Sequence, residues 1–215
     1  MSELRISLEQ VRRALSLPDF DPDPARQRMA PLTRAMRRPD LPGAPKLAGV
    51  LVLLCVDSHS ERLHLVLMRR AETDGVHSGQ MSFPGGRQEP GETFEQTAIR
   101  EALEEIGASQ VEILGALAPL YILPSDFEVH PIVGYVPYRP IWTPQPTEVA
   151  EVVEAPLELL FDEQIKGSEI AQRGELTLNI RYYLINGNKV WGATAIILSE
   201  LEHRLRAVLH LNGVS

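Results

Sequence analysis

The run from Gly86 to Gly107 joins a glycine-rich loop to a segment with helical periodicity and stacked acids. Glu101, Glu104 and Glu105 are three and four positions apart, so a helix would place their side chains as neighbours. Like charges at that spacing repel each other, and Arg100 is the one cation within residues 94–106. A bound divalent cation would reverse this penalty, because it takes carboxylate oxygens as hard ligands. The run therefore predicts a helix that carries a metal site.

The bounds of this helix can be predicted from its flanking residues. Thr93 is suited to the N-cap, with Gln96 three positions later to complete a capping box. Gly107 stands where a C-cap glycine is expected. We therefore expect a helix over residues 94–106, with an apolar face that packs into the core.

Apolar runs before and after this helix predict a sheet. Strands are expected at 47–57, 63–68, 111–120 and 128–138, since each run has strand length and is bounded by turn residues. Near the end of the chain, 181–191 has the pattern of a hairpin with an Asn-Gly turn, and 194–210 that of an amphipathic helix. The six residues 156–161 resemble a short helical turn.

The N-terminal part of the chain differs in composition from the rest. Ser7 and Gln10 form a capping-box pattern that opens a short helix ending before Pro18. From Pro18 to Pro45 the density of proline predicts an irregular segment. We therefore expect an N-terminal extension over 1–46 and one domain over 47–215.

Charge and composition exclude several classes of protein. The net charge of -8 and the scattered arginines give no basic stripe, so we expect no nucleic-acid partner. No stretch approaches about 18 uncharged apolar residues, so no membrane span is expected and the location is predicted to be cytoplasmic. Cys55 is the single cysteine and lies in an apolar run, which predicts a buried thiol and excludes a disulfide within the chain.

The opening run also resembles the Nudix box at every fixed position. Gly86 is followed after five residues by Glu92, and after seven more by Arg100-Glu101, Glu104-Glu105 and Gly107. The resemblance implies an α/β protein with the Nudix α/β/α sandwich and a mixed β-sheet. It also implies an Mg²⁺- or Mn²⁺-dependent pyrophosphohydrolase that acts on a small nucleotide.

The resemblance assigns roles to the residues of the box. In the family, the equivalents of Glu101 and Glu105 bind the metal ion most directly, and the backbone near Gly86 often completes the site. Glu104 corresponds to a further ligand or to the base that accepts a proton from the attacking water. Many members draw that base from a later loop instead, and Glu148 is the candidate here.

Two further residues of the box are expected to support the site. Glu92 precedes the helix and Arg100 lies eight positions later. The resemblance implies that the two form an ion pair, which braces the loop against the helix without taking part in the chemistry.

The residues before the box resemble the coenzyme A pyrophosphatase branch of the family. We expect Arg69 and Arg70 to grip a phosphate, and Phe83 and Gly85 to contact the substrate. The resemblance is incomplete, because Ala71 stands where serine is usual and Gly75 where Arg or His is usual. The residues that match the branch signature are Arg70, Gly79, Phe83, Pro84, Gly85 and Gly86.

Three functions follow from these patterns. The first is hydrolysis of coenzyme A or its acyl derivatives to 3',5'-ADP and (acyl-)4'-phosphopantetheine. The second, favoured by Ala71 and Gly75, is hydrolysis of ADP-ribose, another nucleotide sugar or a dinucleotide. The third is a non-catalytic Nudix module that binds a nucleotide, although such modules have degenerate boxes and this box is intact. A homodimer is expected from the family and from the apolar stretch 196–198.

Overall fold

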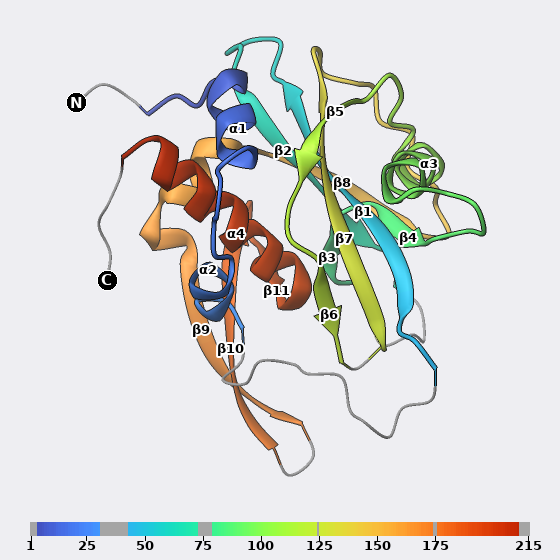
Figure 1. The fold of residues 1–215 in the computed structure, drawn as a ribbon, viewed down its shortest axis with the longest axis vertical. Coiled ribbons are helices and arrows are strands. Elements are labelled where there is room, and N and C mark those ends of the chain that lie inside the picture. The colour runs from blue at the N-terminus through green and yellow to red at the C-terminus, as the bar shows by residue number, and fades with distance from the viewer. Residues whose placement is uncertain (1–3, 31–42, 73–78, 124, 174–175, 211–215) are drawn as a thin grey trace.

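A computed structural model describes residues 4–30, 43–72, 79–123, 125–173 and 176–210. Its main sheet has eight strands and is mixed, because β1 pairs with β7 in parallel and the other pairings are antiparallel. The order is β3-β2-β1-β7-β5, while β4 pairs with β1, β6 with β7 and β8 with β2 (Figure 1). These strands are β1 Lys46–Val56, β2 Leu63–Arg70, β3 Met81–Ser82, β4 Gly85–Arg87, β5 Glu112–Ala116, β6 Leu120–Ile122, β7 Phe127–Val136 and β8 Val149–Pro156.

Helices cover both faces of this sheet (Figure 1). On one face lies α3 (Phe94–Ile106), and on the other lie α4 (Gly192–Val208) and the N-terminal helices α1 (Leu8–Leu15) and α2 (Asp23–Gln27). A second sheet of three strands adjoins α4, with β9 (Lys166–Arg173), β10 (Leu176–Ile185) and β11 (Asn188–Trp191) in the order β11-β10-β9. Two short 3₁₀ turns, Leu157–Phe161 and Glu163–Ile165, precede it. The expected α/β class and mixed sheet are confirmed.

Strand β1 shows why its sequence is apolar without interruption. Leu51, Leu53 and Cys55 belong to the core cluster under α3, whereas Val52 and Leu54 belong to the cluster under α4. Side chains alternate between the faces of a strand, so a strand covered on both faces needs apolar residues at every position. Burial raises the pKa of the Cys55 thiol to about 12, which agrees with its expected role as a buried apolar group.

The predicted bounds of α3 are confirmed. Thr93 and Gln96 form a complete capping box, and Gly107 ends the helix in the left-handed conformation at φ 73°. The capping box of α1, from Ser7 to Gln10, is also present. Local side-chain to backbone hydrogen bonds determine these helix ends, so the sequence alone was sufficient to predict them.

Several predicted bounds in the rest of the chain were wrong. The single strand expected at 111–120 is two strands, β5 and β6, and Pro119 between them has no N–H to donate. Within β5 the register against β7 also shifts between Ile113 and Gly115, where Gly115 has φ 154°. The segment expected to be irregular contains α2, which begins at Asp23 with Pro24 in its first turn, where a missing N–H costs nothing. The strands β8 and β9 were not predicted, and β10 extends well beyond the hairpin expected at 181–191.

Helix α4 is buried on several sides and contains paired charges rather than one polar face. The Glu200 carboxylate is 1% exposed and lies 2.8 Å from Arg26 of α2 and 3.0 Å from Arg204. Glu202 is equally buried and lies 2.7 Å from Lys166 of β9. These pairs attach the N-terminal helices and the second sheet to α4. Within the described residues, no helix combines the length and apolarity needed to cross a bilayer.

Candidate functional site

The candidate site lies where the glycine loop of β4 passes over the C-terminal half of α3. Gly49 of β1 faces α3 so closely that a Cβ there would lie 2.7 Å from the carbonyl oxygen of Phe94. Gly86 pairs with Gly49, and a Cβ on Gly86 would lie 2.4 Å from the Glu101 carboxylate. Both glycines are therefore required by close approach, and the Glu101 carboxylate occupies the space that a side chain would fill.

Glu105 is the most unusual acid of the site, because it is 3% exposed. One carboxylate oxygen accepts a hydrogen bond from the Gly85 backbone N–H at 2.8 Å, and the other lies 3.9 Å from Arg70. Burial, together with the charges of Glu101 and Glu148, raises the pKa of Glu105 to about 7, although Gly85 and Arg70 act in the opposite direction. A second positive charge at this carboxylate would favour its ionised form.

Glu101 and Glu104 differ from Glu105 in their surroundings. The Glu101 side chain is 16% exposed and pairs with Arg100 at 2.7 Å. Glu104 is 58% exposed and lies 3.4 Å from Arg100, on the outer side of the helix. The structure therefore brings Glu101 and Glu105 to the glycine loop and leaves Glu104 outside, where Arg100 attracts it.

Glu92 and Arg100 join the loop to the helix by a two-point ion pair. The guanidinium donates to the two Glu92 carboxylate oxygens at 2.7 and 3.1 Å and to the carbonyl oxygen of Arg87 at 3.2 Å. Glu92 also accepts hydrogen bonds from the Glu89 N–H and the Thr97 hydroxyl. Hydrogen bonding to Arg100 lowers the pKa of Glu92 to about 2.

The end of β2 and the start of β8 bring Arg70 and Glu148 to the same place. The Ala71 N–H donates to the Glu148 carbonyl oxygen at 2.8 Å, so the two segments are in register just beyond Arg70. Glu148 lies close enough to Glu105 to raise its pKa. Arg69, in contrast, pairs with Glu151 at 3.3 Å, and both side chains are substantially exposed.

The structure places the remaining predicted residues differently. Phe83 is 4% exposed and packs in the core cluster under α4, so its side chain is not available to a substrate. Gly85 contributes its backbone, at φ 155°, as the donor to Glu105. Gly75, one of the two departures from the coenzyme A signature, lies outside the described residues.

The donor set suits a hard divalent cation, although the side chains are not gathered around one point. Within the described ranges, no three acidic, histidine or cysteine side chains form a preformed metal-binding cluster. The carboxylates of Glu101 and Glu105 nevertheless contact the same glycine loop. Glu105 is almost fully buried, and the one cation near it is Arg70, at 3.9 Å, among the described residues. Carboxylate and carbonyl oxygens are the ligands that Mg²⁺ and similar ions prefer, so the residues present fit such an ion.

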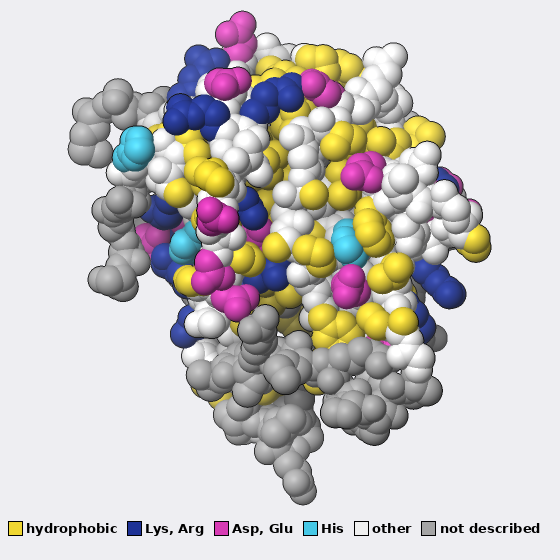
Figure 2. Space-filling model, viewed as in Figure 1, with side chains coloured by type: hydrophobic (Ala, Val, Ile, Leu, Met, Phe, Trp, Pro, Cys, Tyr) yellow, Lys and Arg dark blue, Asp and Glu magenta, His cyan; other side chains and the backbone are white. Residues whose placement is uncertain are grey.

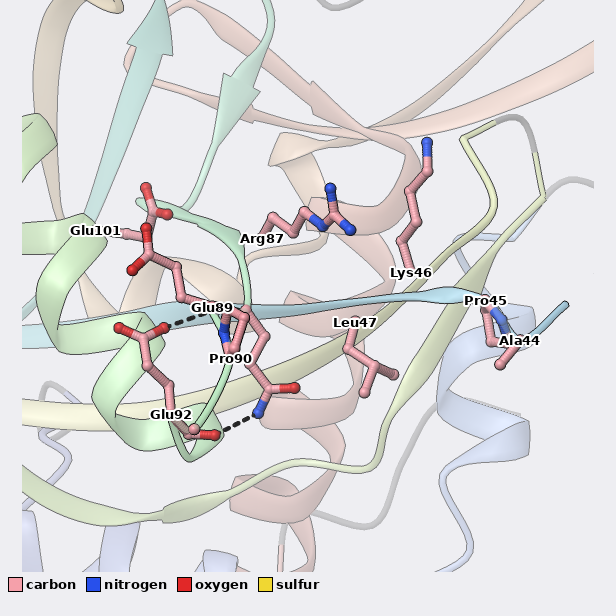
Figure 3. Close-up of a pocket in the computed structure, with 11 residues that line it drawn as sticks. Ala44, Pro45, Lys46, Leu47, Arg87, Glu89, Pro90, Glu92 and Glu101 are labelled. Carbon is pink, nitrogen blue, oxygen red and sulfur yellow. Dashed lines mark hydrogen bonds between the residues drawn. The ribbon is translucent and has the colours of Figure 1, made fainter.

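A cavity of about 820 Å³ begins at Glu101 and extends along the start of β1. Arg87 and Lys46 line it, and Figure 3 shows the Arg87 side chain between Glu101 and Lys46. Sequence reasoning missed both residues, because Arg87 fills a variable position of the box and Lys46 was assigned to the extension. On the face drawn in Figure 2, by comparison, basic side chains are interspersed with acidic ones.

Comparisons with known proteins agree with this geometry. A model of the NUDIX domain matches residues 45–173. An uncharacterised Nudix hydrolase, NudL of Yersinia pestis (strain Pestoides F), is 39% identical over 147 residues, which cover 66% of this chain and 72% of the relative.

Two solved structures share the fold at low sequence identity. The Nudix hydrolase RenU from M. smegmatis aligns with a TM-score of 0.52 at 17% identity, over 80% of this chain and 91% of its own. The MutT protein from Methanosarcina mazei Go1 aligns with a TM-score of 0.51 at 18% identity, over 78% and 98%. The family match and the intact box on a loop and helix of this fold lead to one conclusion: the chain belongs to the Nudix family and is a Nudix pyrophosphohydrolase.

Proposed function

We propose that this enzyme hydrolyses the diphosphate bond of coenzyme A or acyl-coenzyme A, giving 3',5'-ADP and (acyl-)4'-phosphopantetheine. The observation that carries the proposal is the grouping of Glu105, Glu101, Arg70 and Glu148 around one glycine loop. The partial coenzyme A signature from Arg70 to Gly86 supports the choice of substrate.

Nudix hydrolases generally use divalent metal ions. We assign the metal site to Glu101 and Glu105, with the backbone of Gly86 beside them, and expect Mg²⁺ or Mn²⁺. Such an ion, when bound, neutralises charge on the phosphate oxygens and lowers the pKa of a coordinated water. The burial of Glu105 supports this assignment, because an ionised buried carboxylate needs a compensating cation.

The surrounding side chains have separate roles in the proposed reaction. Arg70 points its guanidinium toward Glu105 from a partly exposed position, so it can contact a diphosphate held at the loop. Glu148, the residue just before β8, lies near Glu105 and is our preferred general base. Glu104 is the alternative base, but its pairing with Arg100 holds it on the outer side of the helix.

A nucleotide sugar such as ADP-ribose, or a dinucleotide, is the alternative substrate. The observation that favours it is Ala71, which follows Arg70 at the site and brings a methyl group where the coenzyme A branch usually has a hydroxyl. The reaction at the diphosphate would be the same, and only the recognition of the rest of the substrate would differ.

A product assay by mass spectrometry separates these substrates. Purified protein with Mg²⁺ or Mn²⁺ is incubated with coenzyme A, ADP-ribose, nucleoside triphosphates and diadenosine polyphosphates. We expect 3',5'-ADP from coenzyme A at the highest kcat/KM of the panel. Absence of turnover of coenzyme A, with turnover of ADP-ribose, would replace our first substrate by the second.

Two matched variants test the choice of base. Glu148→Gln is expected to lower kcat by about 10²- to 10⁴-fold and to remove the acidic limb of the pH–rate profile. Glu151→Gln, three residues later on β8 and exposed, should leave kcat within about twofold. If Glu104→Gln removes the acidic limb and Glu148→Gln does not, Glu104 is the base.

A further inference from the structure

Two cations that lie in the cavity beside Glu101 have no acidic partner among the described residues. Lys46 and Arg87 are both exposed, and neither forms an ion pair with any residue that the structure describes. By contrast, the cations near Glu101 and Glu105 have acidic partners, because Arg70 lies beside Glu105 and Arg100 pairs with Glu92. In a chain with a net charge of -8, two unpaired cations in one cavity indicate a place for an external anion.

The sheet register directs these two cations to the same side. Arg87 pairs with Ala48, and Lys46 lies two positions before Ala48 on β1, so both side chains leave the same face of the sheet. The Lys46 ammonium lies 5.4 Å from the centre of the Phe127 ring, its neighbour in register on β7. This ring supports the lysine at the far end of the cavity from Glu101.

The acids of the cavity do not neutralise this end. Glu92 and Glu101 are both bound to Arg100. Figure 3 shows the Glu89 side chain directed toward Glu101 and Glu92, away from Lys46. The Arg87 and Lys46 part of the cavity therefore remains positive, while the part next to α3 is acidic.

The volume and position of the cavity match part of a nucleotide. A volume of about 820 Å³ lies within the range of small-molecule sites. Glu101 lines the cavity, whereas Glu105, Arg70 and Glu148 do not. A substrate whose diphosphate is held at the loop could therefore place a second anionic group in the cavity.

We propose that Lys46 and Arg87 form a separate subsite for a phosphomonoester on the ribose of the substrate. The inference rests on the proposed function, since coenzyme A carries such a group at its 3' position and ADP-ribose does not. The planar guanidinium of Arg87 can bind two phosphate oxygens, and the Lys46 ammonium supplies a compact charge. The subsite would select coenzyme A over dephospho-coenzyme A and would supply recognition that Ala71 does not.

Binding of the expected product tests the subsite without turnover. Isothermal titration calorimetry in EDTA, in phosphate-free buffer, compares 3',5'-ADP with 5'-AMP. We expect the full-length protein to bind 3',5'-ADP at least tenfold more tightly. Lys46→Met and Arg87→Met should each remove most of this preference and leave the binding of AMP unchanged. The control Arg13→Met removes an exposed cation of α1 that also has no acidic partner in the described chain, and should change neither ligand.

Two results would overturn the subsite. One is an equal affinity of the unmodified protein for 3',5'-ADP and AMP. The other is an equal loss for both ligands in the variants, because the two cations would then contact the 5'-phosphate that the ligands share.

Steady-state kinetics separates failure of the subsite from failure of the proposed function. With coenzyme A, Arg87→Met should raise KM about tenfold with little change in kcat, whereas KM for dephospho-coenzyme A should stay constant. If coenzyme A is not hydrolysed at all, the proposed function fails. The preference for 3',5'-ADP over AMP then still decides whether the cavity binds a phosphomonoester.

Discussion

Replacement of Glu105 by glutamine should stabilise the metal-free protein while it abolishes activity. The ordinary pKa of this carboxyl is 4.5, and burial raises it to about 7 in the folded protein. Between these values the folded protein retains a proton that the unfolded chain has released, so the free energy of unfolding falls as pH rises from 4.5 to 7. Above pH 7 the loss is complete, and a pKa difference of about 2.5 corresponds to roughly 3 kcal/mol.

Glutamine has the shape of the protonated carboxyl and can still accept the hydrogen bond from Gly85. Urea denaturation in EDTA at pH 5 and pH 8 measures the effect. We expect Glu105→Gln to exceed the parent in free energy of unfolding, by about 2 kcal/mol more at pH 8 than at pH 5. The control Glu104→Gln, at an exposed position of the same helix, should stay within about 0.5 kcal/mol at both pH values.

Addition of a divalent cation should reverse the order of stability at pH 8. Mg²⁺ or Mn²⁺ at about 1,000 times its dissociation constant stabilises the parent by about 4 kcal/mol, which exceeds the advantage of roughly 3 kcal/mol that the variant has in EDTA, whereas the variant lacks the buried ligand. A Glu105→Gln protein that is less stable than the parent at pH 8 in EDTA would refute the reasoning, because burial would then not oppose ionisation of this group.

Four further predictions follow from close approach and from paired charges. Gly86→Ala should fold but lose at least tenfold in kcat, because the added Cβ displaces the Glu101 carboxylate. Gly49→Ala should lower the melting temperature, because the added Cβ would clash with the backbone carbonyl oxygen of Phe94. Glu92→Gln should lose less stability than the parent between pH 5 and pH 2, as measured by urea titration. The pKa of Glu92 is depressed in the folded protein, so its carboxylate contributes stability above about pH 4.5 that is lost as the pH falls toward 2. Glu200→Gln should cost about 3 kcal/mol in denaturant unfolding, as it leaves Arg26 and Arg204 without their shared carboxylate.

The parts of the fold that were predicted correctly depend on local physics. Capping boxes and the C-cap glycine bound α1 and α3 through hydrogen bonds between near neighbours. The fully apolar β1 could be recognised because a strand buried on both faces has no polar positions. The strands β8 and β9 contain exposed and charged positions, and β8 pairs with the distant β2, so their residues gave no comparable signal.

The spacing of Glu101, Glu104 and Glu105 determined that the chain carries clustered acids on one helix behind a glycine loop. Spacing along a helix sets which side chains are neighbours, but it does not set their burial or partners. Only the packing of α3 against the loop separated the buried Glu105 from the exposed Glu104. Only the pairing of β2 with β8 and of β4 with β1 brought Glu148 to Glu105, and Lys46 and Arg87 into one cavity. Such contacts join residues far apart in the chain, and their geometry is set by the pairing of the strands and by the packing of the helices on the sheet.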